Sequence, residues 1–558
     1  MRELIRRFLS KPVLALEILV ATFFITLLTL AMPLYVIQIL NRYVSYGFHG
    51  TLITLTTGML IAILLQLGFR IIRTKMASVV NQEPNDRLSL EVLNIISQAK
   101  AEPLEQFSKP RIQEALNSVQ TIQNSYDAQT LNTVIDAPFS LLFIAATYLL
   151  SPLLAGVALI GIVIGLFTGW LSIRKSQQNS EQLLLESSKH RSLNYSAVNA
   201  LDTVRAFSAV GFLQKLWQEQ VIKISNFRKK MTDTKELSQT LTMSGSSLTS
   251  VFLYAVGATI VVQGNLTVGA LIGANILAGR AYQNTTKLVQ TNYLLSKAKK
   301  AFTDIALLRR LPLETVKGSA LRVYKGQIEF KDVGFAYPNS SHPVFESLTL
   351  NIAPGKAMAV YGENGTGKTT LAKLLVGLLD PRRGSIMADS VTLQQLAAPW
   401  WRRQIIYMPQ EPTFLNGTIR ENILFLNPEL DEAILNNILR MVDLKQFLDQ
   451  TPNGLDTMIT DNGKNLPLGI RRRLSLARGL VTDGQLVLLD EPTDAMDGKG
   501  IQAVYNVMNE MMKAKKTIIV FSNDPKILKG ASLVLNLNVK PRPELTSQII
   551  PDISKGQI

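Results

Sequence analysis

The chain has 558 residues, contains no cysteine and carries a formal net charge of +16 at pH 7. That length exceeds a single ordinary domain, and the absence of cysteine excludes disulfide frameworks, thiolate metal sites and cysteine catalysis. With 47% apolar and only 18% charged residues, the composition favours a protein with membrane-spanning segments over an ordinary soluble one.

The first half of the sequence contains six apolar segments of about 20 residues, the length that crosses a bilayer as a helix. The first follows MRELIRRFLSKP and precedes further spans, so we interpret it as a signal-anchor helix and not as a cleaved signal peptide. The six predicted spans lie near 18–40, 52–72, 130–150, 152–173, 241–263 and 266–283.

The positive charge is concentrated in this hydrophobic half. Residues 1–316 contain 30 basic and 18 acidic residues, whereas residues 317–558 contain 28 and 24. Basic residues such as Arg7, Arg73 and Arg174 gather at the N-terminus and after spans two and four, while the connections after the other spans carry only Arg42. By the positive-inside rule, both termini are predicted to be cytoplasmic, and no nucleic-acid partner is expected.

The two cytoplasmic connections, of about 55 and 65 residues, keep a helical apolar rhythm and are predicted to extend the membrane helices into the cytoplasm. We therefore expect an α-helical six-span membrane domain over 1–310 and a linker over 311–326. Alternating IEFKDVGFAY then opens an α/β domain over 327–540, and 541–558 is predicted to be a loosely ordered tail.

Within the α/β domain, the apolar stretch AMAVY is followed by GENGTGKT (362–369) and a helix, which is the P-loop pattern in its proper context. Its glycines let backbone N–H groups turn toward phosphate oxygens, Lys368 reaches the terminal phosphates, and the Thr369 hydroxyl ligates Mg²⁺. We therefore assign ATP binding to Gly362, Asn364, Gly365, Gly367, Lys368, Thr369 and Thr370.

A second apolar stretch, QLVLLDEP, supplies two carboxylates. Asp490 at its end is suited to orient Mg²⁺, and Glu491 is placed to accept a proton from an attacking water. Acidic residues after a strand are common in loops, but together with the P-loop they predict a nucleotide-hydrolysis site that uses ATP and Mg²⁺.

A membrane half followed by this ATPase half resembles an ATP-binding cassette (ABC) exporter with one half-transporter per chain, and the resemblance covers nearly the whole sequence. It implies a dimer formed through the ATP-binding domains. It further implies that Tyr337 stacks on adenine, that Gln410 senses Mg²⁺ and the membrane domain, and that Asp497 contacts the facing subunit. The ordinary alternatives are a core tyrosine, a surface glutamine and a turn aspartate.

Two positions depart from the family pattern. NLPLGIRRRLSLAR lies where the family carries its LSGGQ signature, and Pro467 replaces a serine whose hydroxyl and N–H face the γ-phosphate of the opposite subunit. Gly469 still permits close approach of the backbone to that nucleotide. The arginine run 471–473 could supply compensating charge, but we interpret it as a solvated helix face.

The second departure is at the switch position, where the family usually has histidine and this chain has Asn523. An amide can hydrogen-bond a phosphate but cannot carry the charge of imidazole. Because Glu491 is retained, our hypothesis is slow hydrolysis, or hydrolysis concentrated in one site of a heterodimer, with Glu491, Gln410 and Asn523 as the catalytic candidates.

LTLAMPLYVIQILNRYV and VIDAPFSLLF resemble the type I secretion permease/ATPases, which implies an inner-membrane exporter of polypeptide that works with a membrane-fusion protein and an outer-membrane channel. The short N-terminus leaves no room for the peptidase domain of some relatives. Two alternatives stay open, namely an exporter of lipid, peptide or small molecule, and a hydrolysis-impaired half of a heterodimer. Asp136 is a functional candidate, but we favour a position at the membrane interface.

Overall fold

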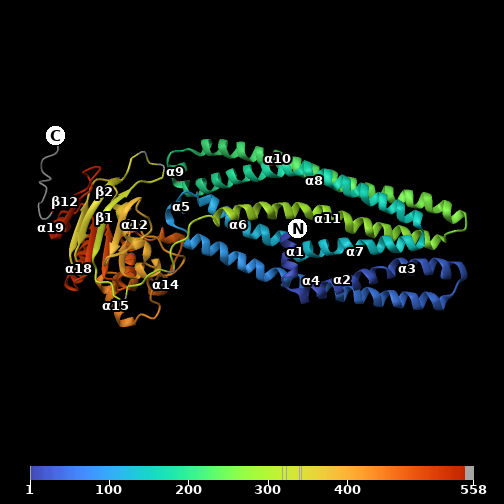
Figure 1. Ribbon diagram of the computed structural model, residues 1–558, viewed down its shortest axis with the longest axis horizontal. Coiled ribbons are helices and arrows are strands. Elements are labelled where there is room, and N and C mark those ends of the chain that lie inside the picture. Colours follow the sequence, from blue (N-terminus) through green and yellow to red (C-terminus); the bar gives the residue numbers. More distant parts are fainter. Residues whose placement is uncertain are drawn as a thin grey trace. The chain divides into compact units, whose positions relative to one another are not determined.

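The computed structural model describes residues 2–546 except 108, 317, 322, 339 and 341 (Figure 1). The chain divides into two compact units. One comprises Met1–Ser97 and Gln106–Leu311, and the other comprises Gln98–Glu105 and Pro312–Ile558.

The first unit is helical throughout its described length. Several of its helices exceed 40 residues, which is longer than a bilayer requires. A single π-helical turn covers Ile39–Val44. The α-helices are α1 (Arg2–Leu9), α2 (Pro12–Thr29), α3 (Ala31–Gln38), α4 (His49–Gln98), α6 (Lys109–Ser125), α7 (Ala128–Leu150), α8 (Pro152–Asn199), α9 (Leu201–Ala206), α10 (Val210–Val262) and α11 (Val268–Leu308).

Local sequence signals set where these helices begin. Asp127 caps α7 by accepting a hydrogen bond from Thr130 N at 2.7 Å, and Thr267 caps α11 by accepting one from Ala270 N at 3.1 Å. Pro152 occupies the first position of α8, where its missing N–H leaves no bond unmade. The short turns before these helices therefore follow directly from the sequence.

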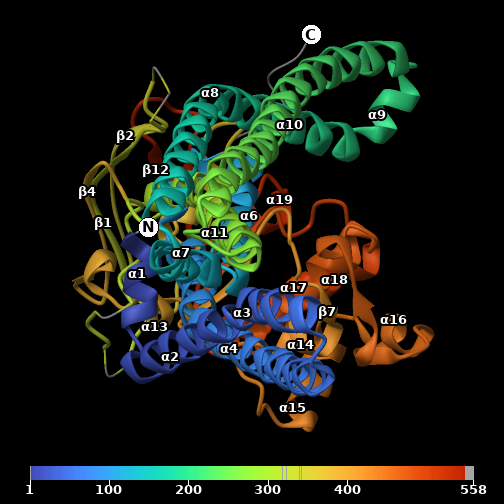
Figure 2. The ribbon, with the colours of Figure 1, turned by 90° about the vertical axis from the view of Figure 1, so that its right-hand side faces the viewer.

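Close helix packing holds the unit together. α8 and α10 run side by side, and α11 packs against α7 (Figures 1 and 2). At Gly161 a Cβ atom would lie only 2.3 Å from Thr249 Oγ1, so α8 and α10 approach closely because this position has no side chain.

By length and composition, five helical stretches in the described chain could cross a membrane: Pro12–Val44, His49–Gln98, Ala128–Leu150, Pro152–Ser172 and Val210–Val262. They include the first five predicted spans, except residue 173 of the fourth and residue 263 of the fifth. The sixth predicted segment, 266–283, is helical from Val268 onward within α11 but is not among these five stretches. Asn275, Arg280 and Gln283 make it more polar than the others. The six-span count therefore stays a prediction.

The second unit is an α/β fold with two main sheets. An antiparallel sheet has the order β2-β1-β4-β5, and a mixed sheet has the order β12-β11-β3-β10-β9-β6, in which every pair except β12-β11 is parallel. The strands are β1 (Ile328–Phe335), β2 (Phe345–Ile352), β3 (Ala357–Tyr361), β4 (Arg383–Ala388), β5 (Val391–Thr392), β6 (Ile405–Met408), β7 (Gly417–Thr418), β8 (Met458–Ile459), β9 (Leu486–Asp490), β10 (Thr517–Phe521), β11 (Leu533–Asn536) and β12 (Glu544–Thr546).

Helices complete this unit and enclose two cores. One core contains Phe330, Phe345 and Trp401, and the other contains Leu474 and Val520. In the view of Figure 2, β1, β2 and β4 lie on the side of the unit opposite α16 and α18. The α-helices are α5 (Ala101–Glu105), α12 (Lys368–Val376), α13 (Ala398–Arg403), α14 (Ile419–Leu424), α15 (Glu432–Met441), α16 (Lys445–Gln450), α17 (Leu468–Leu480), α18 (Gly498–Lys513) and α19 (Pro525–Gly530).

Two segments differ from what the sequence suggests. Residues 98–105 join the second unit, since Lys100 N donates to Pro312 O at 2.9 Å and Glu314 N donates to Gln98 O at 2.7 Å. The predicted tail 541–558 begins within a sheet, because β12 pairs with β11. The rest of that predicted tail lies outside the described residues.

Candidate nucleotide-binding site

The P-loop connects β3 to α12 and takes a backbone course that requires glycine. Gly365 and Gly367 have φ values of +84° and +109°, a region that other residues rarely adopt. A Cβ atom on Gly367 would also lie 2.3 Å from Val344 Cγ1. These glycine conformations are those the sequence predicts, and the binding of phosphate by the N–H groups at the start of α12 remains a prediction.

Lys368, the first residue of α12, is almost fully buried and bonds inside the loop. Its Nζ donates to Gly362 O at 2.5 Å and lies 3.0 Å from Glu491 Oε1. Glu491 has a φ of +48°, and its N–H donates to Phe521 O at 2.8 Å, which fixes the backbone that carries this carboxylate. The structure thus brings the predicted phosphate-binding lysine and the predicted general base into contact.

Asp490, at the end of β9, has no exposed surface, and neither of its carboxylate oxygens has a hydrogen-bond partner among the described residues. Burial raises the pKa of Asp490 to about 6, because water no longer solvates the charged form. Nearby, Thr369 Oγ1 donates to Gln410 Oε1 at 3.4 Å. A buried carboxylate without a partner, beside a hydroxyl and an amide oxygen, is a suitable donor set for Mg²⁺ when phosphate oxygens complete the shell.

Tyr337 lies beside the start of α12. Its hydroxyl is 3.1 Å from Thr370 Oγ1, and its ring meets Phe335 edge to face with centroids 5.0 Å apart. The ring is half-buried, so one part of it stays accessible near the P-loop. Stacking on adenine by Tyr337 remains a prediction.

Two protein-family models match the chain, one over the region of the P-loop and one over the helical unit. Residues 345–494 match the ABC transporter model, and residues 15–283 match the ABC transporter transmembrane region. Together the two models cover most of the chain. The chain is an ABC transporter.

Its relatives include proteins named for toxin translocation. The chain is 24% identical over 528 residues to the Toxin RTX-I translocation ATP-binding protein of Actinobacillus pleuropneumoniae. It is 25% identical over 527 residues to the Alpha-hemolysin translocation ATP-binding protein HlyB of Escherichia coli O157:H7. Each match covers 93% of this chain and 74% of the relative.

A solved structure has the same fold. The structure of a bacterial Atm1-family ABC exporter with ATP bound superposes with a TM-score of 0.83, covering 98% of this chain and 95% of that one at 19% identity. The predicted fold class, a helical membrane domain followed by an ABC nucleotide-binding domain, is confirmed. The findings indicate an ATPase and a multi-pass protein of the bacterial inner membrane.

Asn523, which we align with the switch histidine of the family, is bound to the P-loop. Its Oδ1 accepts from Gly362 N at 3.1 Å, and its Nδ2 donates to Gly362 O at 3.0 Å. Both polar atoms of the side chain are therefore used by one residue of the loop that carries Lys368. Sequence reasoning considered only a bond from this amide to phosphate and missed this pairing.

The segment that we align with the family signature forms the start of α17. Pro467 is the residue before the first turn and provides no side-chain cap. The arginines that follow do not form the expected solvated face, because Arg472 and Arg473 are only 2% and 8% exposed. That interpretation is wrong for these two residues, since each guanidinium finds oxygen partners inside the ATP-binding domain.

Arg472 connects the loops that carry the candidate catalytic groups. Its Nη2 donates to Gln410 O at 3.2 Å, and its Nη1 donates to Glu491 O at 3.0 Å and to Asp494 O. Burial lowers the pKa of Arg472, yet three carbonyl oxygens solvate its charge. The sequence did not indicate that one arginine of the run 471–473 would join these loops.

Arg473 pairs with Asp443 and with Asp497. Asp497 also caps α18 by accepting from Gly500 N at 2.9 Å, and this backbone bond, with Arg473, lowers the pKa of Asp497. A Cβ on Gly469 would meet only Ala495 O at 3.5 Å, which is an ordinary contact within the chain. Contacts of Asp497 and Gly469 with a facing subunit remain predictions.

Two residues just before the predicted tail brace the P-loop. Asn538 Oδ1 accepts from Glu363 N at 2.8 Å, and Lys540 Nζ donates to Thr366 O at 2.7 Å. Burial lowers the pKa of Lys540. Nothing in the sequence signalled these two contacts, because they join residues about 175 positions apart.

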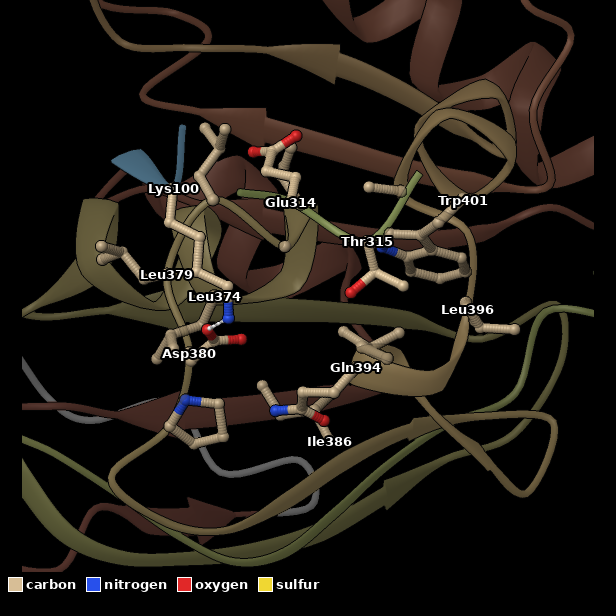
Figure 3. Close-up of a pocket in the computed structure, with 16 residues that line it drawn as sticks. Lys100, Glu314, Thr315, Leu374, Leu379, Asp380, Ile386, Gln394, Leu396 and Trp401 are labelled. Carbon is tan, nitrogen blue, oxygen red and sulfur yellow. Dashed lines mark hydrogen bonds and ion pairs between the residues drawn. The ribbon is translucent and has the colours of Figure 1, made fainter. Parts of the chain in front are cut away.

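A separate cavity of about 60 Å³ lies between residues 98–105 and α12 (Figure 3). Lys100 reaches toward Asp380, and their Nζ and Oδ2 atoms are 2.6 Å apart. Space for a few water molecules is too little for a nucleotide, so this cavity is not a second ATP site.

Proposed function

We propose that this chain is the inner-membrane ATPase and permease of a type I protein secretion system. The observation that supports this most is the similarity, along 93% of the chain, to proteins named for toxin translocation and export. In this proposal both termini are cytoplasmic, the substrate is a polypeptide, and the partners are a membrane-fusion protein and an outer-membrane channel.

The ATP-binding geometry supports a motor role. Lys368 and the P-loop amides would hold the phosphates, and Thr369, Gln410 and Asp490 would hold Mg²⁺, which stabilises the negative charge of the phosphates. Glu491 lies beside Lys368 and would accept a proton from the attacking water. Two copies would close on ATP through their ATP-binding domains, with Asp497 and Gly469 facing the partner.

A second candidate follows from the altered positions. Asn523 has no imidazole and Pro467 has no hydroxyl or N–H, so hydrolysis would be slow in a homodimer. In a heterodimer, a partner with an intact signature and switch histidine would hydrolyse ATP faster at one of the two sites. The retained Glu491 argues against a chain that has lost hydrolysis completely.

A translocation assay tests the proposal. The purified chain is reconstituted in vesicles with its genomically neighbouring membrane-fusion protein, and protection of the neighbouring secreted polypeptide from protease is measured with ATP. We expect protection with the wild type and none with Lys368→Met. Movement of lipid or small molecules without polypeptide protection would contradict the proposal.

The heterodimer candidate has its own measurement. The tagged chain is purified from its native membrane and its partners are identified by mass spectrometry. A second half-transporter in equal amount would establish the heterodimer, whereas recovery of this chain alone would exclude it.

A further inference from the structure

A polar cavity of about 390 Å³ lies within the helical unit. Its lining comes from α4, α7 and α11, and every lining side chain is polar or charged. Ligand pockets of comparable size are usually lined mainly by apolar side chains. The lining comprises two threonines together with Arg73, Gln129, Asn132, Asp136, Asn284 and Lys287.

Two buried atoms in this lining have no hydrogen-bond partner among the described residues. They are Oδ1 of Asn132 and Nε of Arg73, and each of these residues is only 8% exposed. Buried polar atoms in folded proteins nearly always have a partner. Both residues line the cavity, so its wall contains polar groups that the described residues leave unpaired.

The charges of the cavity leave one positive charge in excess. Arg73 pairs with Asp136, with Nη1 2.5 Å from Oδ1, and also donates to Thr22 Oγ1 at 3.3 Å. Asp136 thus neutralises Arg73, which explains this acidic residue in an apolar segment. Lys287 is exposed on α11, and no ion pair of Lys287 is found in the described chain.

The amides of the lining indicate what kind of ligand fits. Three side chains of the lining are amides, each with one N–H₂ donor and one carbonyl acceptor: Gln129, Asn132 and Asn284. A peptide group can pair with both, because its C=O accepts from the N–H₂ and its N–H donates to the carbonyl oxygen. A phosphate group could pair with Lys287, but it has no N–H to offer to the amide carbonyl oxygens of the lining. A peptide with a carboxylate satisfies both the amides and the surplus cation.

We propose that this cavity binds an extended polypeptide segment that carries a carboxylate, as a contact point on the path of the exported chain. This inference rests on the proposed function and names a substrate contact for it. Arg73 directly follows the second predicted span and Asn284 directly follows the sixth. In the proposed orientation the cavity therefore lies where the spans meet the cytoplasm, on the side from which a substrate enters.

The test uses the full-length chain in lipid nanodiscs and two fluorescent probes of twelve residues. One probe repeats Gly-Ser-Asp and ends in a free carboxylate, and the other has Asn in place of Asp and an amidated end. Binding is measured by fluorescence anisotropy. Lys287→Gln should weaken binding of the acidic probe about tenfold and leave the neutral probe unchanged, because only the ionic contact is lost.

Asn132→Leu should weaken both probes about tenfold, since it removes the amide contact that they share. Lys299→Gln makes the same charge change on an exposed position of α11 outside the cavity, and it should change neither probe. Because the chain contains no cysteine, Thr133→Cys gives one labelling position on the lining. The acidic probe should slow its reaction with maleimide, even if another variant folds poorly.

The outcomes separate this inference from the proposed function. If the wild type binds the acidic probe but both cavity variants bind equally well and Thr133→Cys is not protected, the cavity assignment is overturned while polypeptide export stands. If phosphatidylglycerol vesicles protect Thr133→Cys from maleimide and neither peptide probe binds, both the cavity assignment and the polypeptide-export proposal are overturned. Binding at the cavity together with failed polypeptide translocation would overturn the export proposal alone.

Discussion

The ATP-binding domain contains two regions that have changed to different extents. In the phosphate region, the P-loop, Asp490 and Glu491 are the groups that we predict to bind Mg²⁺-ATP. In the region predicted to complete the site, Pro467 stands where we align the family signature and Asn523 where we align the switch histidine. We therefore expect nucleotide binding and the final arrangement for hydrolysis to depend on separable residues.

The altered region is nonetheless well packed. Asn523 holds Gly362 by two hydrogen bonds, and Arg472 joins the loops of Gln410 and Glu491. Asn523 and Arg472 therefore have hydrogen-bond networks of their own within the ATP-binding domain. Variants in the two regions measure how much of the activity depends on each.

The largest effect is expected in the retained region. Glu491→Gln removes the proton acceptor and should lower ATP turnover by about 100-fold or more, while ATP binding persists because the P-loop is unchanged. Turnover by phosphate release and binding by labelled ATP measure the two steps. Residual turnover above a tenth of the wild type would show that another group acts as the base.

Asp490→Asn should stabilise the nucleotide-free protein, because it removes a buried charge without a partner. The pKa of Asp490 is about 6 against an ordinary 3.8, so protonation favours the folded state. The charged Asp490 carboxylate does not destabilise the folded wild type below about pH 4, and its destabilising effect grows between pH 4 and 6. Above pH 6 the effect reaches about 3 kcal/mol, because each unit of pKa difference corresponds to about 1.4 kcal/mol.

Denaturant unfolding of wild type and Asp490→Asn at pH 4.5 and 7.5 measures this difference. The exposed Asp494→Asn is the matched control and should shift little at either pH. Stabilisation by Mg²⁺-ATP should be lost in Asp490→Asn and retained in the control. A gap between wild type and Asp490→Asn that does not widen with pH would contradict burial as the cause.

The sequence predicted local features well and distant contacts poorly. The P-loop conformation follows from Gly365, Gly367 and their neighbours, and Asp490 and Glu491 follow from one buried strand, so both were predictable. The burial within the arginine run was not predictable. Arg472 is buried because it donates to backbone carbonyls of other loops, and one of these, Gln410 O, belongs to a residue 62 positions earlier in the chain. The bracing of the P-loop by Asn538 and Lys540 escaped prediction for the same reason.

Arg472→Met should lower the unfolding free energy of the ATP-binding domain by about 2 kcal/mol, because the carbonyls of Gln410, Glu491 and Asp494 lose a buried charged donor. For a domain of this size that corresponds to a fall in Tm of roughly 4–8 °C. Arg471→Met, on the same helix but partly exposed, should change Tm much less. Equal shifts in the two variants would mean that Arg472 does not bridge these loops.

The smallest effect is expected at the switch position. Asn523→His restores an imidazole beside the P-loop and should raise ATP turnover of the purified chain about tenfold. The gain should vary with pH around the ordinary histidine pKa of about 6.5, whereas the wild type should show no such step. Asn538→His is the matched control, because Asn538 also bonds the P-loop backbone but lies at Glu363. If turnover falls in both variants, the two asparagines mainly support the loop; if it rises only in Asn523→His, the missing histidine is what limits hydrolysis.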